Sequence, residues 1–255
     1  MTAEMRRATF RFYADLNDFL PAERRGVDVE QAFLGSPAVK DLIEAIGVPH
    51  PEVDLILADG APVEFAWRVA DGARVSVYPA FRAVDVASLS RVRPPRPARL
   101  AFVLDGHLGR LARYLRMAGI DTRWRAEPAD AELARESHEA GGILLTRDVG
   151  LLKRSEVIHG AWVRATDPEA QLIEVVRRFD LARAADPFCR CLECNTPLAR
   201  AEKAAIASQL PPGVCARHED FRRCPTCARV YWRGTHWQRM AALLERVVGP
   251  PAYPR

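Results

Sequence analysis

Three aspartates lie where the middle of the chain is expected to pass between strands and helices. Asp105 directly follows the apolar run 100–104, and Asp148 comes two residues after a second apolar run ends. Asp130 precedes the helical stretch 131–140. Because the carboxyl ends of parallel strands meet at one edge of a sheet, we expect the three carboxylates to converge there. Such an all-oxygen site suits Mg²⁺ or Mn²⁺.

Carboxylates that hold a divalent cation can support hydrolysis of phosphodiesters. The cation lowers the pKa of a bound water and offsets charge in the in-line transition state. Each acid also has a structural alternative, since Asp130 could be a helix N-cap and Asp105 and Asp148 could belong to turns. The nearby Asp121 and Glu132 are expected to be structural.

Arginines flank these acids and are predicted to bind the phosphates of RNA. In the expected helix 108–118, the leucines share one face and three arginines share the opposite face. A solvated helix face is the alternative interpretation. The predicted RNA-binding residues are Arg110, Arg113, Arg116 and Arg147.

All six cysteines lie in the last quarter of the chain. Two Cys-x-x-Cys knuckles, Cys191/Cys194 and Cys224/Cys227, can complete a tetrahedral Cys₄ site. This predicts a structural Zn²⁺ without an open position for substrate. Cys189 could replace Cys191 in the site, and otherwise Cys189 and Cys215 remain thiols.

The last quarter of the chain contains two further segments with a predicted structure or function. Residues 195–223 between the knuckles are expected to fold as an excursion with a helix around 199–210. Segment 231–237 combines Tyr, Trp, Arg and His. Its aromatic rings could stack on single-stranded RNA, or Trp232 and Trp237 could pack against the ribbon.

The elements that must position these residues follow two patterns. From residue 100 onward, strand-like and helical stretches alternate, which predicts a parallel, Rossmann-like sheet. Before it, residue 9 begins an expected edge strand, followed by a helix at 38–46 and strands at 53–57 and 74–79. This pattern predicts a small α+β domain. The Pro- and Arg-rich segment 91–99 is expected to be a linker.

The composition of the 255 residues is that of a globular protein, with 49% apolar and 27% charged residues. It argues against collagen-like, disordered and coiled-coil classes. We find no apolar stretch that suits a membrane span and no signal peptide, so a cytoplasmic location is expected. The first third is acidic and the remainder basic, within a net charge of +4. A positive net charge in this part of the chain is typical of proteins that bind nucleic acid.

Two segments resemble known families. Phe102-Val-Leu-Asp105 through Gly119-Ile-Asp121, with Ile143-Leu-Leu-Thr146-Arg147-Asp148, resembles the Mut-seven C-terminal RNase domain, a PIN-like nuclease family, over residues 99–240. That resemblance implies metal-binding acids at Asp105, Asp130 and Asp148. Segment 71–79 resembles the last strand of β-grasp, ubiquitin-like sulfur carriers. The chain continues past the point where a carrier ends in Gly-Gly, so we expect a module that docks a protein partner or positions a substrate.

The resulting hypothesis is an α/β protein of three parts. A ubiquitin-like β-grasp domain spans 1–90, a linker 91–99, a PIN-like RNase core 100–182, and a zinc ribbon with its tail 183–255. The predicted function is a ribonuclease, with endonucleolytic cleavage of RNA, dependent on Mg²⁺ or Mn²⁺. The alternatives are a non-catalytic RNA-binding adaptor associated with tRNA or ribosomes, and a protein-interaction scaffold.

Overall fold

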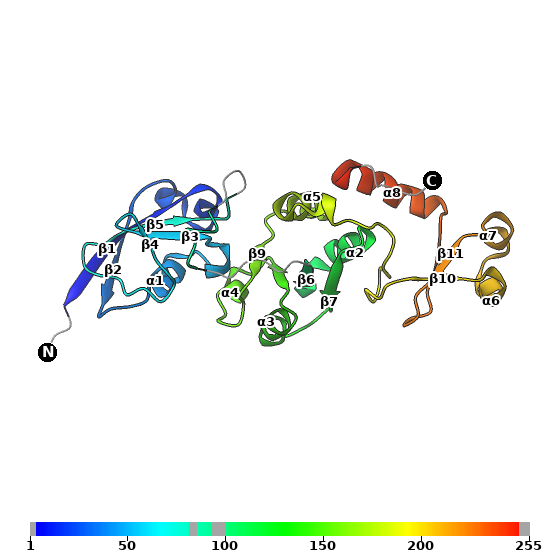
Figure 1. Cartoon of the computed structure of the whole chain (residues 1–255), viewed down its shortest axis with the longest axis horizontal. Coiled ribbons are helices and arrows are strands. Elements are labelled where there is room, and N and C mark those ends of the chain that lie inside the picture. The colour runs from blue at the N-terminus through cyan, green and yellow to red at the C-terminus, as the bar shows by residue number, and fades with distance from the viewer. Residues whose placement is uncertain (1–3, 82–85, 93–99, 250–255) are drawn as a thin grey trace. The chain divides into compact units, whose positions relative to one another are not determined.

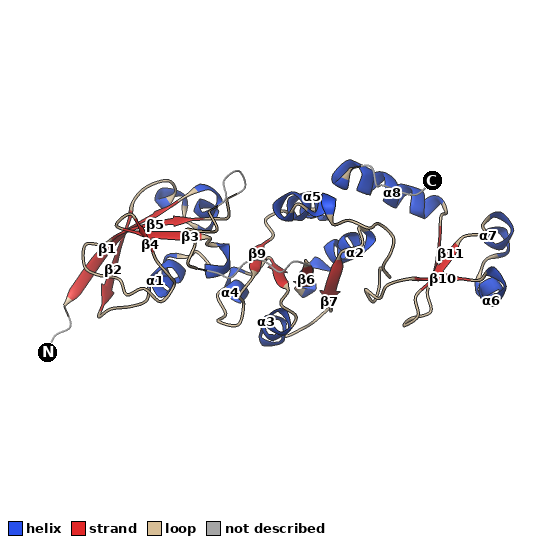
Figure 2. Ribbon diagram, viewed as in Figure 1, coloured by secondary structure: helices blue, strands red, loops and turns tan. Residues whose placement is uncertain are grey.

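The computed structural model describes residues 4–81, 86–92 and 100–249 (Figure 1, Figure 2). The chain divides into two compact units, one of residues 1–98 and 134–162, the other of residues 99–133 and 163–255. The strands are β1 Met5–Phe12, β2 Val29–Leu34, β3 Leu55–Ala58, β4 Ala61–Pro62, β5 Arg74–Tyr78, β6 Ala101–Leu104, β7 Asp121–Trp124, β8 Ile143–Thr146, β9 Gly160–Trp162, β10 Ala199–Ala201, β11 Phe221–Arg223 and β12 Val230–Trp232.

Helices and short 3₁₀ turns connect these strands. The α-helices are α1 Val39–Ile46, α2 Gly109–Met117, α3 Asp130–Glu139, α4 Val149–Leu152, α5 Pro168–Phe179, α6 Lys203–Ile206, α7 Pro212–Arg217 and α8 Thr235–Val248. The 3₁₀ turns are η1 Ala14–Phe19, η2 Ala22–Arg24, η3 His50–Glu52, η4 Gly106–Leu108, η5 Leu181–Arg183 and η6 Ala207–Gln209. None of the helices in the described ranges combines the length and apolar composition that a membrane crossing needs.

The N-terminal sheet has the strand order β2-β1-β5-β3-β4, and α1 lies against it (Figure 1). β1 is antiparallel to β2 and parallel to β5, which is the arrangement of a β-grasp fold. The expected helix is confirmed, and it ends at Gly47 with φ 135°. The expectation that the first strand is an edge strand is wrong, because β2 covers its outer side. β2 was not predicted, because the polar Gln31 interrupts the alternation of inward-facing apolar residues between Val29 and Phe33.

The core of this sheet is aromatic and aliphatic, with Phe10, Phe12 and Ile43 fully buried. Val92 is also buried in this core, so the packed domain reaches into the segment predicted to be a linker. The rest of that predicted linker, residues 93–99, lies outside the described residues.

The central sheet has the strand order β7-β6-β8-β9, and its pairs β6–β7 and β8–β9 are parallel. The predicted alternation of strands and helices is confirmed here. Leu108, Leu111 and Leu115 are buried, as the helical periodicity of α2 indicates. The short helical elements η4 and α4 were not predicted, because each spans a single turn after a strand.

In the first unit, the β-grasp domain packs on β9 through η3. The backbone N–H of Trp162 donates to Glu52 Oε1 at 2.7 Å, and Glu52 is only 3% exposed. His50 Nε2 lies 2.8 Å from the carbonyl oxygen of Val157, and the rings of Phe19 and Trp162 are 5.0 Å apart. The N-terminal domain therefore covers the outer edge of β9.

The C-terminal sheet is antiparallel and small, with the strand order β10-β11-β12 (Figure 2). Its core consists of Ile206, Leu210 and Phe221, with Trp232 packed against it. The helix expected around 199–210 is wrong over its first residues, because 199–201 pair with β11 as a strand and α6 begins only at Lys203. Tertiary pairing thus overrides the helical preference of this Ala-rich stretch.

Candidate functional site

Asp105 directly follows β6 and is only 5% exposed. Its Oδ1 accepts from the backbone N–H of His107 at 2.9 Å, which makes Asp105 the N-cap of η4. At Gly106, a Cβ atom would overlap the carbonyl oxygen of Ala126. Only glycine permits this close approach, so the Asp105 turn packs directly on the segment that leads into α3.

Asp130 is the first residue of α3 and is exposed. The carbonyl oxygen of Ala129 accepts from the backbone N–H groups of Glu132 and Leu133 at 2.9 and 3.1 Å. Ala129 is therefore the N-cap, and the alternative that Asp130 caps the helix is wrong. The Asp130 carboxylate instead lies in the first turn, where negative charge is favourable.

Asp148 follows β8 and caps the short helix α4. Its Oδ1 accepts from the backbone N–H groups of Gly150 at 2.7 Å and Leu151 at 3.4 Å. The turn-forming roles foreseen as alternatives for Asp105 and Asp148 are thus present. Asp148 belongs to the first unit and the other two acids to the second. Convergence of the three carboxylates on one cation stays a prediction.

The predicted phosphate-binding arginines have different surroundings. Arg110 and Arg147 are exposed, and Arg147 immediately precedes Asp148. Arg113 is exposed and forms an ion pair with Glu193 of the first knuckle. These three remain candidates for contact with phosphate.

Arg116 does not fit the predicted role, because it is only 3% exposed. Its Nε donates to the carbonyl oxygen of Thr122 at 2.9 Å, and its Nη1 donates to those of Leu192 and Glu193 at 3.0 and 2.6 Å. Burial lowers the pKa of Arg116, and the neighbouring Cys191 opposes this shift. The prediction that Arg116 binds RNA is wrong: its guanidinium joins α2 to the first knuckle.

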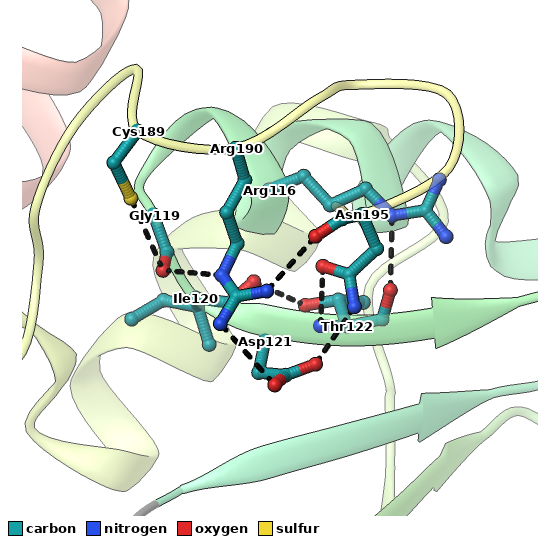
Figure 3. Close-up of polar contacts among 8 residues, drawn as sticks. All are labelled: Arg116, Gly119, Ile120, Asp121, Thr122, Cys189, Arg190 and Asn195. Carbon is teal, nitrogen blue, oxygen red and sulfur yellow. Dashed lines mark hydrogen bonds and ion pairs between the residues drawn. The ribbon is translucent and has the colours of Figure 1, made fainter. Parts of the chain in front are cut away.

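A cluster of polar residues, here called the docking cluster, extends this junction (Figure 3). Arg190 donates to the carbonyl oxygens of Gly119 and Asn195 at 3.1 and 2.9 Å, and to Asp121 Oδ2 at 3.2 Å. Asn195 Nδ2 donates to Asp121 Oδ1 at 2.7 Å. Its Oδ1 accepts from Thr122 N at 3.0 Å. Asp121 is therefore structural, as expected. The docking cluster consists of Arg116, Asp121, Thr122, Arg190 and Asn195.

The four knuckle cysteines form the predicted cluster, and all four Sγ atoms lie within 4.8 Å of one another. Cys191 Sγ is 3.5 Å from Cys227 Sγ, and Cys194 Sγ is 3.3 Å from Cys224 Sγ. A tetrahedral ion with Zn–S bonds of about 2.3 Å requires sulfur atoms roughly 3.8 Å apart. The donor set therefore fits a metal such as zinc, whereas Cys189 and Cys215 lie outside the cluster.

The two knuckles repeat one backbone structure. Asn195 N donates to Cys191 O and Ala228 N donates to Cys224 O, both at 3.0 Å. The residue after each second cysteine has positive φ, 66° at Asn195 and 62° at Ala228. This repetition places two pairs of thiols on a common centre.

Hydrogen-bonding groups lie beside two of the four thiols. The hydroxyl of Tyr231 accepts from Leu192 N at 3.1 Å, and its oxygen lies 3.1 Å from Cys191 Sγ. Burial raises the pKa of Tyr231, so its proton remains available to a Cys191 thiolate. Burial opposes ionisation of Cys194, but hydrogen bonding with Thr196 lowers the pKa of its thiol to about 6.

Sequence reasoning missed Arg190 and Asn195, and it considered Tyr231 only as part of the aromatic segment 231–237. One signal was available: Asn tolerates positive φ better than most residues, and Asn195 directly follows a Cys-x-x-Cys pair. Nothing in the local sequence indicates that Arg190 or Tyr231 would serve the knuckle. Their partners are distant in the chain.

A β-grasp domain, a Rossmann-like sheet and a ribbon with two clustered Cys-x-x-Cys knuckles define a multipart α/β protein. Residues 100–244 match the Mut7-C RNAse domain, and residues 5–85 match the Mut7-C ubiquitin domain, Ub-Mut7C. The first match covers more than half of the sequence, so the chain belongs to the Mut7-C RNAse domain family. Comparisons with curated proteins and with solved structures give no match.

Proposed function

We propose that the chain is a metal-dependent ribonuclease that cleaves RNA endonucleolytically. Asp105, Asp130 and Asp148 would hold Mg²⁺ or Mn²⁺, and the cation would supply an activated water and offset charge on the phosphate. The family match supports the reaction class. The observation that carries the residue assignment is the buried carboxylate of Asp105 at the end of β6, in a turn that contacts the entrance to α3.

The positions of the acids relative to the strands support this assignment. Asp105 and Asp148 follow β6 and β8, which are neighbours in the strand order. Ligands of open parallel sheets bind outside the carboxyl ends of the strands. Every hydrogen bond from a described residue to the Asp148 side chain goes to Oδ1, which leaves Oδ2 for another partner. Arg110, Arg113 and Arg147 would bind the phosphate backbone.

We assign zinc to the four cysteines and give it a structural role. Four thiolates complete the tetrahedral shell, so no position remains for a substrate or a reactive water. The ubiquitin-like domain would bind a protein partner.

The test is cleavage of a labelled circular RNA by the purified full chain with Mg²⁺ or Mn²⁺, because a circular substrate has no end for an exonuclease. Asp105→Asn and Asp148→Asn should each reduce cleavage by about 100-fold or more, the size of effect typical when one charge-stabilising group is lost. Asparagine keeps the Oδ1 acceptor that each N-cap uses, so the turns should persist.

Asp180→Asn is the matched control. Asp180 is exposed at φ 50°, a conformation that asparagine tolerates, and this variant should cleave normally. Unchanged cleavage in both Asp105→Asn and Asp148→Asn would refute the assignment. RNA binding without cleavage in either metal would select the alternative of a non-catalytic RNA-binding adaptor.

A further inference from the structure

A cleft of about 1010 Å³ lies in the second unit, where α2 faces the ribbon and the first turns of α8. Small-molecule sites typically occupy roughly 300–1,000 Å³, so this volume suits an extended segment of a polymer. None of the proposed metal-binding acids lines the cleft.

One wall of the cleft is a regular stripe on α2. Arg110, Arg113, Tyr114 and Met117 line it, and their spacing of three, four and seven residues places them on one helix face. Arg110 is exposed, and no described residue forms an ion pair or a side-chain hydrogen bond with it. Its charge is therefore available to a ligand.

A second group of lining residues comes from the ribbon. Arg222 of β11 is exposed and, like Arg110, has no ion pair or side-chain hydrogen bond with any described residue. Arg229 shares Glu193 with Arg113, at 3.7 Å from the carboxylate.

The lining is cationic overall, because six arginines face three carboxylates. Two of these arginines are already held closely. Arg190 is buried and paired with Asp121, and Arg113 is paired with Glu193. The excess positive charge therefore resides mainly at Arg110 of α2 and Arg222 of β11. The lining residues that carry charge are Arg110, Arg113, Arg190, Arg222, Arg229, Arg233, Asp186, Glu193 and Asp220.

Partly exposed aromatic rings lie beside these charges. Trp237 packs against Phe188 with ring centroids 5.0 Å apart, and the Arg233 guanidinium carbon lies 5.4 Å from the Trp237 centroid. A nucleobase that stacks on Trp237 would take the place of the Arg233 guanidinium on this ring. Tyr114 and Trp232 add two further rings to the lining.

We infer that this cleft binds a single-stranded segment of RNA, with phosphates at Arg110 and Arg222 and a base against Trp237. The inference rests on the proposed function for RNA as the substrate. An acidic peptide could form ion pairs with the arginines, but its glutamate or aspartate side chains offer no ring that could stack on the aromatic side chains. A duplex would keep its bases within the stack, away from these rings.

The test is a fluorescence anisotropy titration of the zinc-loaded full chain in buffer without added Mg²⁺ or Mn²⁺. The probes are a labelled single-stranded RNA, its duplex and a poly-glutamate peptide. Arg110→Ala and Arg222→Ala should each weaken binding of the single strand several-fold. Each should also reduce the slope of log affinity against log salt concentration by about 0.7, the contribution of one phosphate contact.

Trp237→Ala should weaken binding about fivefold or more, and Trp237→Phe should retain most of the affinity. The matched control is Arg239→Ala, because Arg239 is exposed on α8 but does not line the cleft. This variant should bind as the unmodified chain does. Metal content and circular dichroism identify any variant whose ribbon has not folded.

Normal affinity and an unchanged salt slope in both arginine variants would overturn the inference. So would equal affinity for duplex and single strand, or a preference for poly-glutamate. If the chain never cleaves RNA and the cleft variants still lose binding, the proposed function fails and this inference stands. If cleavage depends on Asp148 but the cleft variants bind normally, only this inference fails.

Discussion

The residue after the second cysteine of each knuckle has positive φ, and it is Asn195 in one knuckle and Ala228 in the other. Asn195 has a side chain that bonds Asp121 and Thr122, and asparagine tolerates its positive φ. Ala228 has nearly the same φ without any such compensation. A left-handed conformation costs an ordinary L-residue roughly 1–2 kcal/mol. The second knuckle therefore retains strain that glycine would remove.

We expect Ala228→Gly to stabilise the metal-loaded protein by about 1 kcal/mol, less the entropy that glycine adds to the unfolded chain. Chemical denaturation followed by tryptophan fluorescence measures the change. Ala242→Gly, in the interior of α8, should instead destabilise by about 1 kcal/mol. A loss of stability with Ala228→Gly would show that the left-handed position carries no strain.

Single residues were predictable where spacing alone carries the chemistry. The cluster of four cysteines was predicted because Cys-x-x-Cys pairs have a local geometric reason to cluster. Arg116 was misassigned because helical periodicity treats the polar face as solvated, whereas the carbonyl groups of Leu192 and Glu193 cover it. A helical wheel contains no information about a ribbon more than 70 residues away in the chain.

At the scale of elements, the edge of the central sheet is protected by a neighbouring domain. The strand order leaves β9 at one end, where an exposed edge would offer unpaired N–H groups to other chains. Glu52 of η3 accepts one of these groups, at Trp162. The ubiquitin-like domain therefore has a structural role besides any partner binding.

Glu52→Ala should remove this acceptor and destabilise the chain by about 1–3 kcal/mol, the cost of a buried donor left unsatisfied. Hydrogen exchange followed by mass spectrometry should show faster exchange in the peptide containing β9. Glu52→Gln keeps a side-chain oxygen and should retain most of the protection. The exposed Glu64→Ala is the control. Unchanged exchange in Glu52→Ala would mean that the edge is not held by this contact.

Elements with strong periodicity were predicted from the sequence, and those that depend on distant partners were not. The strand, helix and strand pattern of the central sheet needs only alternation and length. β2 and β10 are short or interrupted in pattern, and each exists because it pairs with a strand far along the sequence. For the candidate site, the ends of the expected strands indicated the positions of Asp105 and Asp148. The backbone hydrogen bonds that hold their turns were not predicted.

At the scale of the whole molecule, the hydrophobic core is unevenly distributed. The N-terminal domain has an extensive buried cluster that includes Phe10, Phe12 and Ile43. Among the described residues, the hydrophobic cluster of the ribbon has only Ile206, Leu210 and Phe221 as buried members. A core this small rarely stabilises a domain without a metal or a disulfide.

We therefore expect a strong zinc chelator to unfold the ribbon and leave the β-grasp domain folded. Hydrogen exchange should rise across residues 189–232 while residues 5–78 stay protected, and re-addition of zinc should restore the protection. Magnesium added in place of zinc should not restore it, because thiolates favour softer ions. Full protection of the ribbon after complete removal of metal would contradict this expectation.

The division of the chain into two compact units was not predictable from the order of the segments. The domains predicted from the sequence are continuous segments of the chain. In the structure, residues 134–162 belong with the N-terminal domain and residues 99–133 with the ribbon. The contacts that decide this membership include Trp162 with Glu52 and Arg116 with Leu192. Each joins residues widely separated in sequence, and no local pattern encodes such pairs.

The contacts of the Arg116 guanidinium also limit where the protein can be truncated. An expression fragment that stops before residue 190 would retain this buried cation and delete two of its three carbonyl acceptors. Such a product should aggregate or be degraded, even though its sheet strands are complete. Recombinant truncations and chimeras therefore need to keep Arg116 and its acceptors, up to residue 193, in one chain.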